Sequence, residues 1–166
     1  MSLFIPAAAI VFACMILEAR VAARHERVQR AAGAIEPAGD VYRAMQVAYP
    51  AAFLAMLGEG AVRGSSIDMV AGIGIALFVA SKALKYWATS TLGERWTFRV
   101  LVPPGSPLVV LGPYRYMRHP NYVAVVGELA GTALAMHALV TGPVAVCGFG
   151  ALILRRIRIE NRALAR

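Results

Sequence analysis

The longest apolar stretch of the chain, Tyr122–Leu154, contains a single charged residue, Glu128. As one helix it would reach about 50 Å, whereas the hydrocarbon core of a bilayer is only about 30 Å thick. The segment His137–Pro143 supplies a break, so we expect two short helices in a hairpin. One long tilted helix is the alternative, and it would leave the chain with four spans.

Three further segments carry at most one charged residue each and also have the composition of membrane spans. Each is shorter than the ~20 residues that cross a bilayer, but flanking Lys and Arg side chains can extend a span by reaching toward the headgroups. Lys82 and Lys85 follow the third segment and are expected at the membrane interface. The segments are Leu3–Leu17, Val41–Leu57 and Met69–Ser81.

The composition argues against an ordinary soluble domain. Hydrophobic residues make up 59% of the 166 residues and charged residues 16%, against roughly 45–50% and 25% in soluble proteins. Cys14 and Cys147 lie in apolar runs and form neither a disulfide framework nor a metal-ligand pattern. We therefore predict a single all-α integral membrane domain with about five transmembrane helices and no metal site.

The distribution of basic residues supports five spans. Sixteen of the 17 Lys and Arg residues fall after the first, third or fifth predicted span or at the start of the second, and the exception is Arg63. With an odd number of spans all sixteen lie on one side, which the positive-inside rule makes cytoplasmic. The net charge of +8 is thus explained by topology, and no nucleic-acid partner is expected.

The densest polar cluster lies just before the fourth predicted span, in Gly112–Tyr122. Pro120 suits the first turn of a helix, where its missing N–H is not needed. Tyr114, His119 and Tyr122 would then gather at the cytoplasmic mouth of that span. An interfacial belt of Tyr and Arg is the alternative, but it does not explain a His-Pro-x-Tyr helix start.

Two further features are candidate chemical groups. Arg156 and Glu160 are four residues apart, so they share one helix face; the alternative is a surface ion pair. Glu128 is a carboxylate inside a span, where a charge is costly and often functional. Its alternative role is a structural hydrogen bond to another helix, for example to Gln46 or Thr132.

These motifs resemble those of the isoprenylcysteine carboxyl methyltransferase family of integral membrane enzymes. The resemblance extends from about Leu92 to the C-terminus. Phospholipid methyltransferases share the RHPxY element, and sterol reductases have a more distant version. The matching residues are Leu111-Gly112-Pro113-Tyr114, Arg118-His119-Pro120-Asn121-Tyr122, Arg156, Glu160 and Leu164.

The resemblance implies an S-adenosylmethionine site on the cytoplasmic side, built by the last helices and the loop before span four. Residues 1–91 would supply the N-terminal spans and residues 92–166 the cofactor-binding part. Arg156 would face a lipophilic acceptor that enters from the bilayer. The residues expected to contact the cofactor are Ser106, Pro107, Leu108, Val109, Tyr114, His119, Pro120, Tyr122 and Glu160.

The acceptor class stays open between an isoprenylcysteine-like carboxylate and a lipid phenol or pyrone. A carboxylate needs no general base at pH 7, whereas a phenol with a pKa near 10 does. Glu128 or His119 is the candidate base. The predicted catalytic residues are Glu128, as that base, and Arg156, which would face the acceptor. The family pattern has a Glu-Glu pair where this chain has Glu160-Asn161.

Two other functions fit the same residues. A membrane reductase of the sterol-reductase type would use NADPH and could bind its 2′-phosphate through Arg115, Arg118 and Arg158. A non-catalytic membrane scaffold would need the clusters only as interfacial belts. In each case we expect a bacterial inner-membrane protein, and for an enzyme an active site that faces the cytoplasm.

Topology gives the first testable prediction. Reporter fusions should place the C-terminus in the cytoplasm and the N-terminus on the exported side, because the basic residues then all face inward except Arg63. Two cytoplasmic ends would indicate four spans and would contradict the predicted hairpin.

Overall fold

The computed structural model describes residues 4–102, 104–105 and 108–164 of the chain. These residues form five α-helices and two 3₁₀ turns, η1 (Gly93–Arg95) and η2 (Gly112–Arg115), and no β-strand. The predicted all-α fold with five helices is therefore confirmed. The helices are α1 (Phe4–Ala31), α2 (Tyr42–Arg63), α3 (Met69–Leu92), α4 (Pro120–Ala135) and α5 (Thr141–Leu164).

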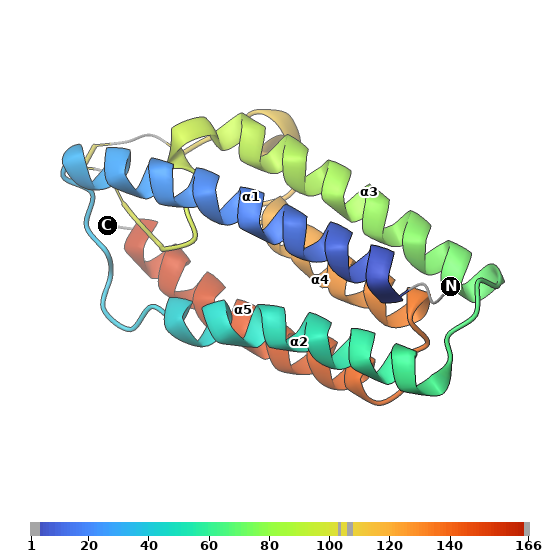
Figure 1. Cartoon of the computed structure of the whole chain (residues 1–166). Coiled ribbons are helices and arrows are strands. Elements are labelled where there is room, and N and C mark those ends of the chain that lie inside the picture. Colours follow the sequence, from blue (N-terminus) through green and yellow to red (C-terminus); the bar gives the residue numbers. More distant parts are fainter. Residues whose placement is uncertain (1–3, 103, 106–107, 165–166) are drawn as a thin grey trace.

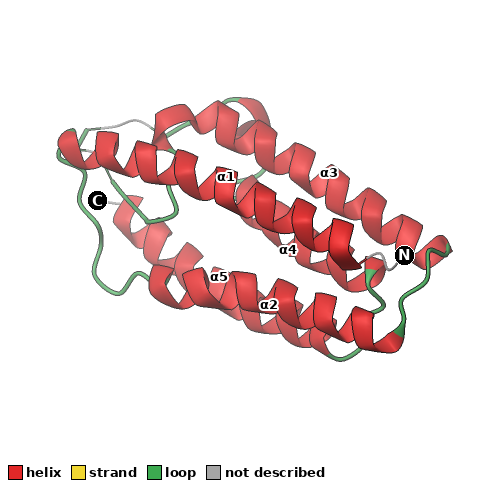
Figure 2. Ribbon diagram, in the orientation of Figure 1, coloured by secondary structure: helices red, strands yellow, loops and turns green. Residues whose placement is uncertain are grey.

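Consecutive helices run in opposite directions, and the two chain ends lie at opposite ends of the bundle (Figure 1; Figure 2). The C-terminal ends of α1, α3 and α5 therefore meet at one end, which we call the basic end because Arg30, Arg95 and Arg162 lie there. Ile5–Ala31 and Met69–Arg95 are long and apolar enough to cross a membrane. That α2, α4 and α5 also cross the membrane stays a prediction.

The apolar stretch after Tyr122 is broken as predicted, since α4 ends at Ala135 and α5 begins at Thr141. The alternative of one long helix is wrong. Glu59 of α2 helps to fix the break, because its carboxylate accepts hydrogen bonds from the Thr141 backbone N–H and hydroxyl at 2.7 and 2.6 Å. These bonds satisfy donors that the first turn of a helix otherwise leaves unpaired.

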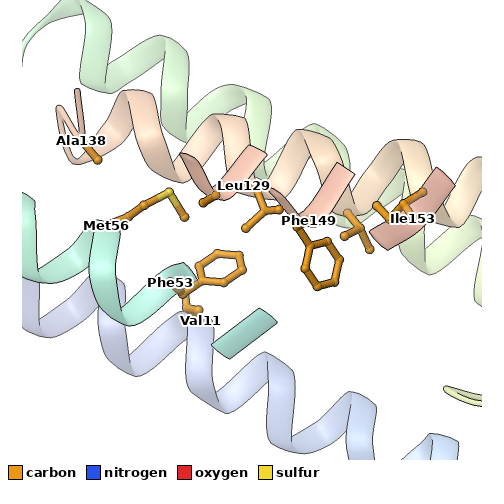
Figure 3. Packing of buried hydrophobic residues seen from close by; sticks show 9 residues of the cluster. Val11, Phe53, Met56, Leu129, Ala138, Phe149 and Ile153 are labelled. Atoms are coloured by element: carbon orange, nitrogen blue, oxygen red, sulfur yellow. The ribbon is translucent and has the colours of Figure 1, made fainter. Parts of the chain in front are cut away.

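An apolar core joins α1, α2, α4 and α5 (Figure 3). Phe53 and Met56 of α2 meet Leu129 of α4 and Phe149 of α5, and all four side chains are buried. The alanine- and glycine-rich helices thus use a few large side chains to fill the middle of the bundle.

α3 and α4 approach each other closely through glycines. A Cβ atom at Gly74 would lie 2.3 Å from the backbone nitrogen of Ala135, and one at Gly131 would lie 2.7 Å from that of Phe78. Small residues that let backbones touch are typical of membrane helix pairs. This contact fixes α4, and with it the start of α4 at the basic end.

Replacing Gly74 by Ala should therefore lower the free energy of unfolding by about 1–3 kcal/mol, the usual cost of overpacking. Gly72→Ala is the matched control on the same helix, because a Cβ there meets nothing within 4 Å. The control should be neutral or slightly stabilising, since alanine favours helix over glycine. Thermal unfolding in detergent measures both, and equal midpoints would contradict the close contact.

Candidate active site

Arg156 of α5 is buried and is the centre of the polar contacts at the basic end. Its Nε donates to the Tyr122 hydroxyl at 2.9 Å, and its Nη2 donates to the Phe98 carbonyl. Its Nη1 lies 3.5 Å from Oδ1 of Asp40, a carboxylate that is itself buried. One guanidinium thus connects α5 and α4 with both long connecting segments.

Tyr122 links Arg156 to Glu160. The hydroxyl donates to Glu160 Oε2 at 2.8 Å. The His119 ring stacks on the Tyr122 ring with the centroids 5.5 Å apart, and its Nδ1 lies 3.8 Å from the same Glu160 oxygen. Burial and the nearby Glu160 charge raise the pKa of Tyr114. Five predicted site residues therefore lie in one cluster.

Two polar atoms of this region are buried without a hydrogen-bond partner among the described residues. They are Nε2 of His119 and Oδ1 of Asn121. A buried polar atom without a partner costs free energy that a polar ligand would recover. The residues present therefore fit a polar cofactor on the His119 side of the cluster.

Local sequence explains how the loop reaches this position. Pro120 is the first residue of α4, as predicted from its missing N–H, and it is buried. Gly112 has φ +55, and a Cβ there would lie 2.5 Å from the Thr91 hydroxyl, so the loop packs directly on α3. Leu108 is 64% exposed and Val109 is half-buried. Ser106 and Pro107 lie outside the described residues.

A cavity of about 560 Å³ adjoins the polar cluster. Arg156, Tyr122 and Asn121 contribute to its lining, which extends along α1 from Phe12 to Glu26, a rise of roughly 21 Å. Most of the lining is apolar. The exposed members of the lining are Ile16, Ala19, Ala23 and Gln46, which place its mouth between α1 and α2.

Glu128 lies elsewhere, in the middle of the bundle, and is 1% exposed. Its Oε2 is 2.9 Å from Lys82 Nζ and its Oε1 is 3.2 Å from Lys85 Nζ. Tyr49 donates its hydroxyl proton to Oε2 at 2.5 Å. Glu128 does not line the cavity, but Tyr49 and Lys85 do. The predicted base is thus separated from the cavity by these two side chains.

The partners of Glu128 differ from those expected from the sequence. Thr132 donates to its backbone carbonyl and not to its carboxylate. The two lysines are part of the bundle interior and not of the interface, because Glu18 of α1 also binds them, at 2.7 and 2.6 Å. Sequence reasoning missed this cluster, although Lys82 and Lys85 are spaced to share one helix face.

The comparisons with known proteins agree with the motif analysis. The family profile described as "Isoprenylcysteine carboxyl methyltransferase (ICMT) family" matches residues 74–166. An "Uncharacterized protein YpbQ" of Bacillus subtilis is 34% identical over 152 residues, covering 89% of this chain and 88% of that protein. An "Uncharacterized protein" of Haemophilus influenzae is 26% identical over 161 residues, covering 94% of each chain.

The buried ion cluster predicts a large stability effect. Glu128→Gln leaves Lys82 and Lys85 with Glu18 as their one carboxylate in the cluster, and should lower the free energy of unfolding by about 3 kcal/mol. Glu94→Gln, at an exposed position, is the control and should change it by less than about 0.5 kcal/mol. Unfolding of both variants in detergent measures this. An unchanged free energy of unfolding in Glu128→Gln would show that the ion cluster does not stabilise the fold.

Proposed function

Because the chain belongs to the isoprenylcysteine carboxyl methyltransferase family, we propose that it transfers the methyl group of S-adenosylmethionine to an oxygen atom of a lipophilic acceptor. Family membership makes it a membrane methyltransferase in kind. The observation that carries the finer proposal is the position of Tyr122, which bonds Glu160 on one side and Arg156 in the cavity wall on the other.

On the cofactor side, the cluster offers groups that match the polar parts of S-adenosylmethionine. The Glu160 carboxylate suits ribose hydroxyls or the amino group, and His119 Nε2 has no hydrogen-bond partner among the described residues. Tyr114, like any tyrosine, keeps its proton at neutral pH, and burial raises its pKa further, so it can donate a hydrogen bond. When bound, the cofactor supplies an electrophilic methyl group on a sulfonium. The protein's part is to hold the reacting groups in line.

On the acceptor side, the cavity suits a molecule with a long apolar body. Its mouth lies between α1 and α2, on the side of the bundle where lipid would lie. Arg156 lines the end of the cavity beside the polar cluster, which we call its inner end, and would attract an acceptor carboxylate by a charge-assisted hydrogen bond. Bringing that oxygen beside Tyr122 places it at the border of the cofactor cluster.

Between the two acceptor chemistries, the geometry favours a carboxylate. A phenol would need a base at the inner end of the cavity, whereas Glu128 is ion-paired with Lys82 and Lys85 and does not line the cavity. A carboxylate is ionised at neutral pH and needs only Arg156. We assign Glu128 a supporting role for this acceptor and a base role only for a phenol.

We place both parts of the reaction in one domain. Residues 92–166 supply the proposed cofactor groups, and residues 1–91 supply much of the cavity. The basic end would face the cytoplasm of a bacterial inner membrane, which is where a soluble cofactor is available to it.

Glu160→Gln should weaken binding of S-adenosylhomocysteine about tenfold, because a charge-assisted hydrogen bond in a partly exposed site is lost. Arg162→Gln, at an exposed position two residues further along α5, should leave the affinity unchanged. Titration calorimetry of detergent-solubilised protein measures both variants. Unchanged affinity in Glu160→Gln would remove this residue from the site.

The same titration separates the other functions. Heat on adding NADPH, with none from S-adenosylhomocysteine, would replace the proposal with a reductase. Heat from neither ligand would favour a membrane scaffold.

A further inference from the structure

The cavity has a second group of polar side chains, well away from Arg156. Glu18 of α1, Tyr49 of α2 and Lys85 of α3 all line it, and we call them the mid-bundle polar set. Lys85 Nζ donates to Glu18 Oε2 at 2.6 Å and lies 5.4 Å from the centre of the Tyr49 ring. Three helices thus bring donors and acceptors to one place in a wall that is mostly apolar.

The depth of this set follows from α4. Tyr49 and Lys85 both contact Glu128, which is six residues beyond Tyr122 on the same helix. Six residues of helix rise about 9 Å. The mid-bundle polar set therefore lies roughly 9 Å further along the bundle than the end of the cavity where Tyr122 meets Arg156.

Helix anchoring alone does not require this set to face the cavity. Lys82 already joins α1 and α4, since it lies 2.7 Å from Glu18 and 2.9 Å from Glu128. Lys82 does not line the cavity, whereas Lys85 does. Charged groups inside a membrane are costly, so polar groups turned toward a cavity for an apolar ligand call for an explanation.

The charges of the cluster indicate what it would bind. Glu18 and Glu128 balance Lys82 and Lys85, so neither an anion nor a cation has an unpaired counter-charge to meet. A neutral oxygen function suits it better. A hydroxyl could accept from Lys85 and donate to Glu18 or to the Tyr49 oxygen, and a ketone could accept from Lys85.

We propose that the mid-bundle polar set binds a neutral hydroxyl or ketone in the body of the acceptor, roughly 9 Å along the bundle axis from the oxygen that is methylated. This inference rests on the proposed function and narrows its substrate class. The acceptor is then an oxygenated lipid and not one with a plain hydrocarbon chain. Phe12, Met15 and Phe149 also line the cavity and offer apolar contact to the rest of the acceptor.

The test uses two long-chain carboxylic acids of equal length. One carries a hydroxyl about 9 Å from the carboxylate, and the other has none. Binding is measured by titration calorimetry on the full chain in lipid nanodiscs with S-adenosylhomocysteine present, and methylation is measured separately. The parent protein should bind the hydroxy acid about 10-fold more tightly, as a site built for a hydroxyl leaves its polar groups unpaired without one.

Tyr49→Phe should reduce that preference, because it removes one hydroxyl of the set and keeps the ring. Tyr86→Phe on α3 is the control, since Tyr86 is 75% exposed and does not line the cavity; it should keep the preference in full. The parent's own preference tests the inference even where Tyr49→Phe fails to fold.

Equal affinities for the two acids in the parent protein, or binding of neither, would overturn the inference. A preference that survives Tyr49→Phe unchanged would overturn the role assigned to the Tyr49 oxygen and would leave Glu18 and Lys85 as the contacts. Selective binding of the hydroxy acid without methylation of either acid would count against the proposed methyl transfer and would leave the polar set as the binding site.

Discussion

The arrangement of the basic end depends on how the charge of Arg156 is satisfied. A buried guanidinium is costly unless charged and polar partners surround it. Asp40 supplies the carboxylate, and it also accepts hydrogen bonds from the backbone N–H groups of Val100 and Tyr42 at 3.0 and 3.2 Å. The segments before α2 and after η1 are therefore held by one ion pair, which in turn sets the place of the cavity's inner end.

A second set of charges supports the same segments from outside. Arg99 Nη1 lies 2.8 Å from Glu36 Oε1, and Arg99 Cζ lies 4.4 Å from the centre of the Tyr42 ring. Arg30 Nη2 lies 2.8 Å from Glu36 Oε2. Although burial opposes it, the hydrogen bonds from Arg30 and Arg99 lower the pKa of Glu36. Each exposed pair contributes little alone. Together they tie the end of α1 to the loop that covers Arg156.

Much of this architecture was predictable because it is local in sequence. The break after Ala135 follows from the length of the apolar stretch, and the start of α4 follows from Pro120. Arg156 and Glu160 can reach the same partner because their four-residue spacing puts them on one face of α5. The motif around Pro120 predicted that this partner, Tyr122, belongs to the site.

The remaining contacts were not predictable because they depend on how the helices are rotated. α3 is apolar around most of its surface, so its sequence does not tell whether Lys82 and Lys85 face lipid, interface or interior. Only packing against α4 through Gly74 and Gly131 turns the lysines toward Glu128. The Asp40 partner of Arg156 is likewise set by tertiary structure.

The hydroxyl of Tyr122 joins the two halves of the site in one direction only. Arg156 can donate but not accept, and the Glu160 carboxylate can accept but not donate. A hydroxyl has one hydrogen, so Tyr122 accepts a hydrogen bond from Arg156 and donates one to Glu160. Each bond of such a row polarises the next in a buried setting. Phenylalanine at this position would keep the stacking on His119. It would remove the hydroxyl that links the Arg156 guanidinium to the Glu160 carboxylate. The tyrosine is therefore required as a hydrogen-bonding group and not only as an aromatic one.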